Sequence, residues 1–155
     1  MDAMILMITA ALMSWANPTT DARAAEVREI AREIPAAAEL AGVDPWRLAA
    51  LVVKESGARL DVVGRLGECG PAQVQGRYLR PPMRCTELQT AQGGLYGAAR
   101  ALIQWRQAEP DRYWHCYAAG NHCYAPRAER RLQRLEAELR ARAAAWLASR
   151  AMGEK

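Results

Sequence analysis

Helical periodicity recurs along this chain, whereas the alternating pattern of strands is nearly absent. Apolar residues that return every three or four positions predict a set of helices. We expect these helices over about residues 20–34, 35–41, 45–56, 111–118 and 126–151, with a further one beginning at Thr86. The pattern therefore predicts an all-α fold.

Signals at the helix ends set the expected boundaries. Pro35 is expected to separate the first two helices, because proline lacks a backbone donor and clashes with the preceding turn. Asp44 followed by Pro45 is typical of a helix N-terminus. Thr86 and Gln89 have the spacing of a capping box, so we expect a helix to begin there.

An uncharged apolar block, AMILMITAALMSWA, occupies residues 3–16. It is too short to cross a bilayer, and no other stretch reaches the ~18–20 apolar residues required, which excludes a multi-span membrane protein. The block has the length of a signal-peptide core, although Asp2 stands where positive charge is usual. We expect residues 1–16 to be a signal peptide or, alternatively, an apolar helix packed on the domain. Residues 17–155 are expected to form a single domain.

Composition and charge narrow the choice of partners. With 155 residues, 51% hydrophobic and 25% charged, the chain is typical of one globular domain. Its 21 basic and 17 acidic side chains give a net charge of +4, which leaves cell-wall polymer, membrane surface and nucleic acid open. In the C-terminal helix, however, arginines alternate with Glu129, Glu136 and Glu138, which indicates a mostly solvated face. We therefore expect no nucleic-acid partner.

Four cysteines, Cys69, Cys85, Cys116 and Cys123, lie in the second half of the chain. An even number in an exported chain favours two disulfides, for which three pairings exist. We choose the most local pairing, Cys69–Cys85 with Cys116–Cys123. The last two cysteines each follow a histidine, but the spacing matches no usual zinc finger, so we expect neither a metal nor a cofactor.

Glu55 is the first candidate for chemistry. On the predicted helix 45–56 it continues the apolar stripe of Leu48, Leu51 and Val52, since it lies seven, four and three residues after them. A carboxylate at that position points to the edge of the core or into a cleft, where burial favours the protonated form that a general acid needs. The alternative is a structural carboxylate paired with an arginine.

The segment after Glu55 carries a resemblance. Glu55-Ser56 is followed by a loop that ends in GECGPAQ at residues 67–73, with Gln73 eighteen residues after the glutamate. Helix, Glu-Ser pair and loop resemble the catalytic domain of soluble lytic transglycosylases, relatives of goose-type lysozyme. The resemblance implies a lysozyme-like helical fold with a glycine-rich loop after the catalytic helix, and it covers roughly residues 36–135.

A third element of that family is an Ala-Tyr-Asn-x-Gly motif. Here Tyr117-Ala118-Ala119-Gly120 keeps the tyrosine and the glycine, but alanine replaces the asparagine. Pro71-Ala72 replaces the usual Leu-Met pair, and Gly64 stands where family members often have serine. The resemblance places substrate contacts at Ser56, Gly67, Gly70, Gln73, Tyr117 and Gly120.

The implied reaction is cleavage of the β-1,4 bond between N-acetylmuramic acid and N-acetylglucosamine in peptidoglycan. Glu55 acts first as acid and then as base, and the sugar's own C6 hydroxyl closes a 1,6-anhydro ring, so a second carboxylate is not needed. A lysozyme-type hydrolase would need one, and Glu68 and Asp61 are the candidates.

The resemblance also implies a partner and a location. The partner is the glycan strand of peptidoglycan, and the location is the periplasm or the cell wall after export, or alternatively a virion. A catalytically weak wall-binding component of a phage particle or secretion system is the non-enzymatic alternative.

Overall fold

The computed structural model describes residues 3–119 and 123–153. Their regular secondary structure is helical, with only two isolated bridges, Val63 to Cys69 and Cys69 to Val74, in place of strands. This confirms the all-α prediction. The α-helices are α1 (Ala3–Ala16), α2 (Asp21–Ala41), α3 (Pro45–Ser56), α4 (Cys85–Leu88), α5 (Ala91–Ala108), α6 (Tyr113–Ala119) and α7 (Pro126–Gly153), and a short 3₁₀ helix, η1, covers Gly76–Tyr78.

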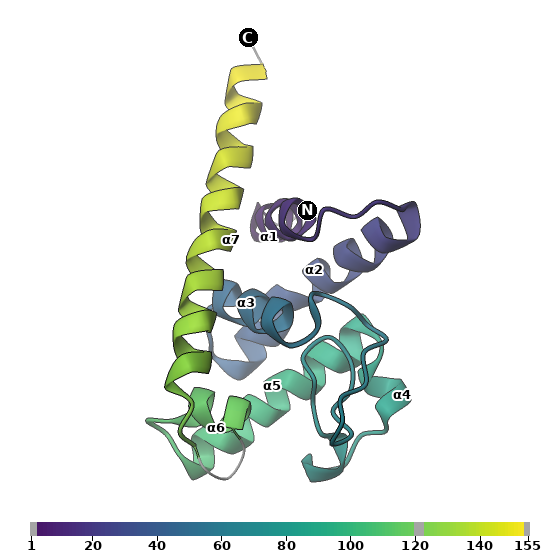
Figure 1. The fold of residues 1–155 in the computed structure, drawn as a ribbon, viewed down its shortest axis with the longest axis vertical. Coiled ribbons are helices and arrows are strands. Elements are labelled where there is room, and N and C mark those ends of the chain that lie inside the picture. The colour runs from purple at the N-terminus through teal and green to yellow at the C-terminus, as the bar shows by residue number, and fades with distance from the viewer. Residues whose placement is uncertain (1–2, 120–122, 154–155) are drawn as a thin grey trace.

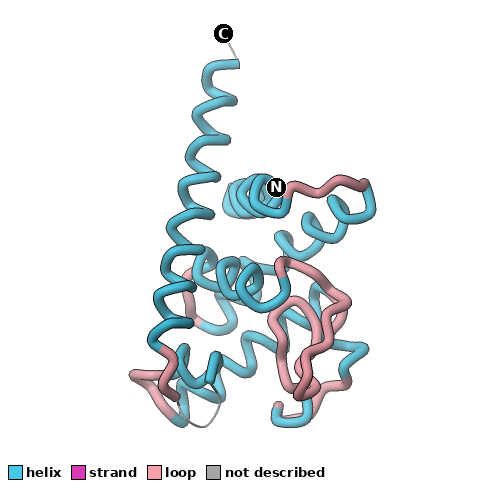
Figure 2. Tube along the Cα trace, in the orientation of Figure 1, coloured by secondary structure: helices cyan, strands magenta, loops and turns pink. Residues whose placement is uncertain are grey.

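Helix α3 is buried over most of its length. It packs against α2 and α7, while α2 also contacts α1 and α5, and α6 lies between α5 and α7. The long helix α7 runs along one side of the molecule, and its last turns extend beyond the other helices (Figure 1). The loop that follows α3 folds back on itself before α4 (Figure 2).

The boundaries of α3 are those that the sequence predicts. The Asp44 carboxylate accepts a hydrogen bond from the backbone of Trp46 at 2.8 Å, and Pro45 occupies the first turn. Gly57 ends the helix in the left-handed conformation, with φ of 66°. Between these ends, all residues from Trp46 to Val53 except Arg47 are buried, and each large apolar side chain there contributes about 1.5–3 kcal/mol.

The predicted break at Pro35 is wrong. Helix α2 continues through Pro35 to Ala41 and ends at Gly42, whose φ is 60°. A proline inside a helix costs about 3 kcal/mol. Both flanks of Pro35 are buried, with Ile30, Ala31, Ile34, Ala37, Ala38 and Ala41 in the core, so packing against α1 and α5 offsets that cost.

The predicted start at Thr86 is also wrong. A single turn, α4, begins at Cys85, and Glu87 accepts a hydrogen bond from the Arg84 backbone at 2.7 Å. The long helix α5 begins only at Ala91, where the Thr90 hydroxyl accepts from the Gly93 backbone at 3.0 Å. The cap thus lies one turn later than the sequence suggests.

The apolar N-terminal block forms α1, which packs on α2 and α7. Ile8, Ala11 and Leu12 are buried in the common core, and Arg142 of α7 donates to the carbonyl of Ser14 at 3.0 Å. In the described part of the chain, no helix combines the length and the hydropathy that a membrane span requires.

Two disulfides, Cys69–Cys85 and Cys116–Cys123, join the cysteines in the predicted local pairing. The first links the loop after α3 to α4, and the second links α6 to the segment before α7. Disulfides of this kind are typical of the oxidising environment that exported proteins meet.

Candidate functional site

Glu55 lies in the last turn of α3, at the edge of the core. Its side chain is 20% exposed, and the apolar stripe of Leu48, Leu51 and Val52 below it is buried. The ammonium group of Lys54, itself 13% exposed, contacts Glu55 Oε1. The other carboxylate oxygen, Oε2, forms no hydrogen bond with the described residues. Glu55 thus has one oxygen in an ion pair and one without a hydrogen bond in the described part of the chain.

Two residues of α2 anchor the chain directly after Glu55. The Arg23 guanidinium donates to the carbonyls of Gly57 and Ala58, both at 2.6 Å. Glu26 pairs with Arg23 at 2.6 Å and accepts from the Leu60 backbone at 2.7 Å. Charged groups thereby satisfy the carbonyls at the end of α3, where helical partners run out.

Ser56 takes part in the same helix end. Its hydroxyl donates to the Val52 carbonyl at 3.2 Å and accepts from the Arg59 backbone at 3.0 Å. The side chain expected to contact substrate is therefore already engaged in capping α3.

The two glycines predicted to line a cleft differ in their surroundings. Gly67, with φ of 83°, is exposed, and a methyl group there would meet nothing closer than 3.9 Å. Gly70, with φ of 77°, is buried, and a methyl group there would lie 1.8 Å from the Leu88 carbonyl oxygen. A ligand can thus approach the backbone at Gly67. At Gly70, the absence of a side chain lets the loop pack directly against the end of α4.

Gln73 holds the loop together. Its backbone is in the left-handed region, with φ of 51°, and its amide donates to the carbonyls of Val62 and Gly70, both at 3.0 Å. The amide oxygen faces Gly64, where an added methyl group would lie 2.8 Å away. The donor side of this amide is therefore committed to the loop.

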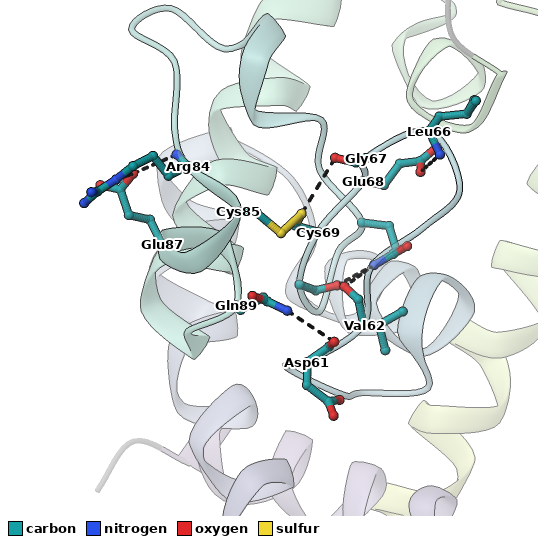
Figure 3. The surroundings of a disulfide bond; sticks show 12 residues. Asp61, Val62, Leu66, Gly67, Glu68, Cys69, Arg84, Cys85, Glu87 and Gln89 are labelled. Atoms are coloured by element: carbon teal, nitrogen blue, oxygen red, sulfur yellow. Dashed lines mark hydrogen bonds and ion pairs between the residues drawn. A yellow bond between two sulfur atoms is a disulfide. The ribbon is translucent and has the colours of Figure 1, made fainter.

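The two candidates for a second acid lie on the loop itself (Figure 3). Glu68 accepts from the Leu66 backbone at 2.9 Å, and its carboxylate covers Gly64, where a methyl group would lie 2.3 Å from Oε2. Asp61 is exposed, and its carbonyl accepts from the Gln89 amide at 3.2 Å while its carboxylate points away from the loop (Figure 3). Neither carboxylate contacts Glu55 among the described residues.

Tyr117 of α6 joins distant parts of the site. Its hydroxyl donates to the Ala72 carbonyl at 2.8 Å, across 45 residues of sequence. Burial raises the pKa of Tyr117 well above 10, and the negative charge of Glu55 raises that pKa further. The phenol and the Glu55 carboxylate therefore lie close enough to interact electrostatically. Gly120, the last residue of the predicted motif, lies outside the described residues.

Three residues around Glu55 were not predicted from the sequence: Lys54, Arg23 and Glu26. Neighbouring residues on a helix do not normally face each other, so nothing in the pattern pairs Lys54 with Glu55. Arg23 and Glu26 have the spacing of a local ion pair, but their reach to residues 57–60 depends on tertiary packing. Within the described residues, no group of three or more histidine, cysteine or acidic side chains is arranged to hold a metal ion.

Comparison with family models, with curated proteins and with solved structures returned no match.

Proposed function

We propose that this chain is an exported, peptidoglycan-cleaving lytic transglycosylase in which Glu55 is the acid and then the base. The observation that supports it best is the position of Tyr117. Through Ala72 and Glu55, this one side chain connects the three separate segments that carry the family resemblance. Segments that lie far apart in sequence thus meet around one partly exposed carboxylate.

The reaction needs one proton that Glu55 gives and then recovers. Protonated Glu55 donates to the glycosidic oxygen as the bond between that oxygen and C1 of N-acetylmuramic acid breaks. The ionised carboxylate then takes the proton of the C6 hydroxyl on the same sugar, and O6 bonds to C1. The products are a 1,6-anhydro end and a free hydroxyl, and no water is consumed. Intramolecular attack is favoured because the nucleophile is held beside the reacting carbon.

The surroundings of Glu55 support the second half of this cycle, in which the carboxylate accepts a proton. The contact with Lys54 corresponds to the ionised carboxylate, which is the form required for the second half. Oε2, which has no partner in the described part of the chain, is the oxygen assigned to the glycosidic bond. Arg23 and Glu26 keep the following backbone in place, and Tyr117 holds the Ala72 segment beside α6.

The test is the chemical identity of the product. Purified peptidoglycan is digested with the protein, and the released muropeptides are analysed by mass spectrometry. The proposal expects 1,6-anhydromuramic ends. Reducing ends, heavier by one water, would instead indicate a lysozyme-type hydrolase, and Glu68 and Asp61 would have to move toward the substrate to supply the second acid.

One observation favours a second candidate, a catalytically weak wall-binding component of a phage particle or secretion system. A lysine paired with a partly buried glutamate is also an ordinary structural ion pair, and such pairs need no catalytic role. This candidate expects the protein to sediment with insoluble peptidoglycan while releasing no products from a wall preparation that lysozyme digests.

A further inference from the structure

In the first turns of α7, up to Arg134, acidic and basic side chains lie on different faces. Glu129 and Glu136 turn toward α3, where both pair with Arg47, whose side chain is 15% exposed. Further along, Arg140 pairs with Asp44 and Glu136. Two of the three acidic side chains that alternate with arginine therefore lie on the side that packs against the domain, and the third, Glu138, is exposed and pairs with Arg142 at 2.7 Å.

The opposite face of the first turns of α7, up to Arg134, carries arginines and no acidic side chain, and Glu138, one turn further along, pairs with Arg142. Arg127, Arg130, Arg131 and Arg134, which we name the arginine face, are exposed and form no ion pair or hydrogen bond with the described residues. Three of them line an open hollow of about 580 Å³ together with Gln133 and Ala137. Four like charges on two helical turns repel one another unless an anion is present.

The geometry of this face selects the anion. From Arg127 to Arg134 the helix rises about 10.5 Å, so the guanidinium groups form a line that a chain of anions can follow. Guanidinium groups bind phosphate through paired hydrogen bonds. The residues that line the hollow include no aromatic side chain for stacking bases and no apolar side chain larger than alanine for entering a bilayer. Tyr124, 78% exposed, is not among those lining residues.

We propose that the arginine face binds a linear phosphate-bearing polymer without bases. The proposal is independent of any catalytic role of Glu55, because binding is measured without turnover. The probe is fluorescently labelled poly(glycerol phosphate), with binding followed by anisotropy in the full-length protein at several salt concentrations. If about three phosphates are contacted, log K should fall with log salt with a slope of about −2 to −3.

A matched pair of variants tests the site. Arg130→Glu/Arg134→Glu changes two exposed, unpaired arginines four residues apart on α7. Arg28→Glu/Arg32→Glu does the same on α2, where Glu29 and Glu33 lie beside them. Each Arg→Glu substitution lowers the net charge by two units, so each double variant has a net charge of zero instead of +4. We expect about a tenfold or greater loss of affinity for the α7 variant and less than about threefold for the α2 variant.

Three results would overturn the proposal. Equal losses in both variants would mean that net charge alone attracts the polymer. Duplex DNA binding about tenfold more tightly than poly(glycerol phosphate) would make the face a nucleic-acid site. Absence of binding by the unaltered protein at low salt would mean that the face has no polyanion ligand. Should the α7 variant unfold, Arg130→Gln/Arg134→Gln removes the same two positive charges without adding acids, and it is compared with Arg28→Gln/Arg32→Gln, which has the same net charge.

Discussion

The Tyr117 hydroxyl donates a hydrogen bond to the Ala72 carbonyl at 2.8 Å, and this bond ties α6 to the loop that follows α3. Burial raises the pKa of the same phenol, and the negative charge of Glu55 raises it further. One side chain thus reports on both the loop and the end of α3. Removing the Tyr117 hydroxyl should therefore measure how much the bond between α6 and this loop contributes to stability.

We predict that Tyr117→Phe lowers the free energy of unfolding by about 1–3 kcal/mol, because the ring is kept while the carbonyl of the buried Ala72 loses its donor. Urea denaturation followed by circular dichroism measures this change. Tyr96→Phe is the control, because Tyr96 is 48% exposed and its hydroxyl has no hydrogen bond within the described residues. A loss no greater than that of the control would mean that the Ala72 contact contributes nothing.

The raised pKa of Tyr117 makes a separate prediction at alkaline pH. In the unfolded chain a tyrosine ionises near pH ~10, whereas burial and Glu55 keep folded Tyr117 protonated above that pH. The unfolded state therefore releases a proton first, and this group's contribution to stability is lost as pH rises above ~10. Absorbance titration of the folded protein should show a late-ionising tyrosine that is missing in Tyr117→Phe. An unchanged titration curve in the variant would contradict the assignment.

Local signals in the sequence were enough to predict much of this fold. Asp44, Pro45 and Gly57 delimit α3 because each acts through its own backbone or side chain, independently of the rest of the chain. The predicted pairing of cysteines near in sequence is confirmed for the same reason, since short separations bring two residues together in most folds. Features that depend on neighbouring residues alone, such as these helix ends, can therefore be predicted from the sequence.

The incorrect predictions are places where packing decides. Pro35 is a strong local stop signal, yet buried side chains on both sides carry the helix through it. The surroundings of Glu55 show the same dependence. The contact between Lys54 and Glu55 depends on how the last turn of α3 packs on the core, and Arg23, which binds the backbone after Glu55, comes from another helix. The split of the α7 charges into two faces likewise depends on Arg47 of α3. Periodicity could not predict these contacts.

The assignment of Glu55 predicts that Glu55→Gln loses about 10²–10⁴-fold in the rate of muropeptide release, since glutamine keeps the shape but transfers no proton. The matched control is Glu39→Gln, an exposed glutamate of α2 without a partner in the described residues. Thermal melts of both variants confirm that they fold. Turnover in Glu55→Gln equal to that of the control would remove Glu55 from the mechanism.

Arg23→Ala should destabilise the protein by about 1.5–3 kcal/mol, because charge-assisted hydrogen bonds to Gly57 and Ala58 are lost. Arg28→Ala, five residues further along α2 and exposed, should change stability by less than about 0.5 kcal/mol. If the chain is the proposed enzyme, kcat of Arg23→Ala should fall more than KM rises, since the backbone next to Glu55 loosens. Equal stability of the two variants would show that Arg23 does not anchor the loop.

Gly67 and Gly70 give the sharpest test of the loop, because they share a left-handed backbone but not their surroundings. Alanine at either position should lower the free energy of unfolding by about 1–2 kcal/mol because φ is positive there. At Gly67 nothing else is expected, since the added methyl group would meet only the end of the Arg77 side chain, at 3.9 Å. At Gly70 the methyl group would lie 1.8 Å from the Leu88 carbonyl oxygen, so loop and α4 must separate.

We expect Gly70→Ala to lower the free energy of unfolding by at least about 2 kcal/mol more than Gly67→Ala. Urea denaturation of the two variants with both disulfides intact measures the difference, and equal losses would mean that the loop does not pack on Leu88.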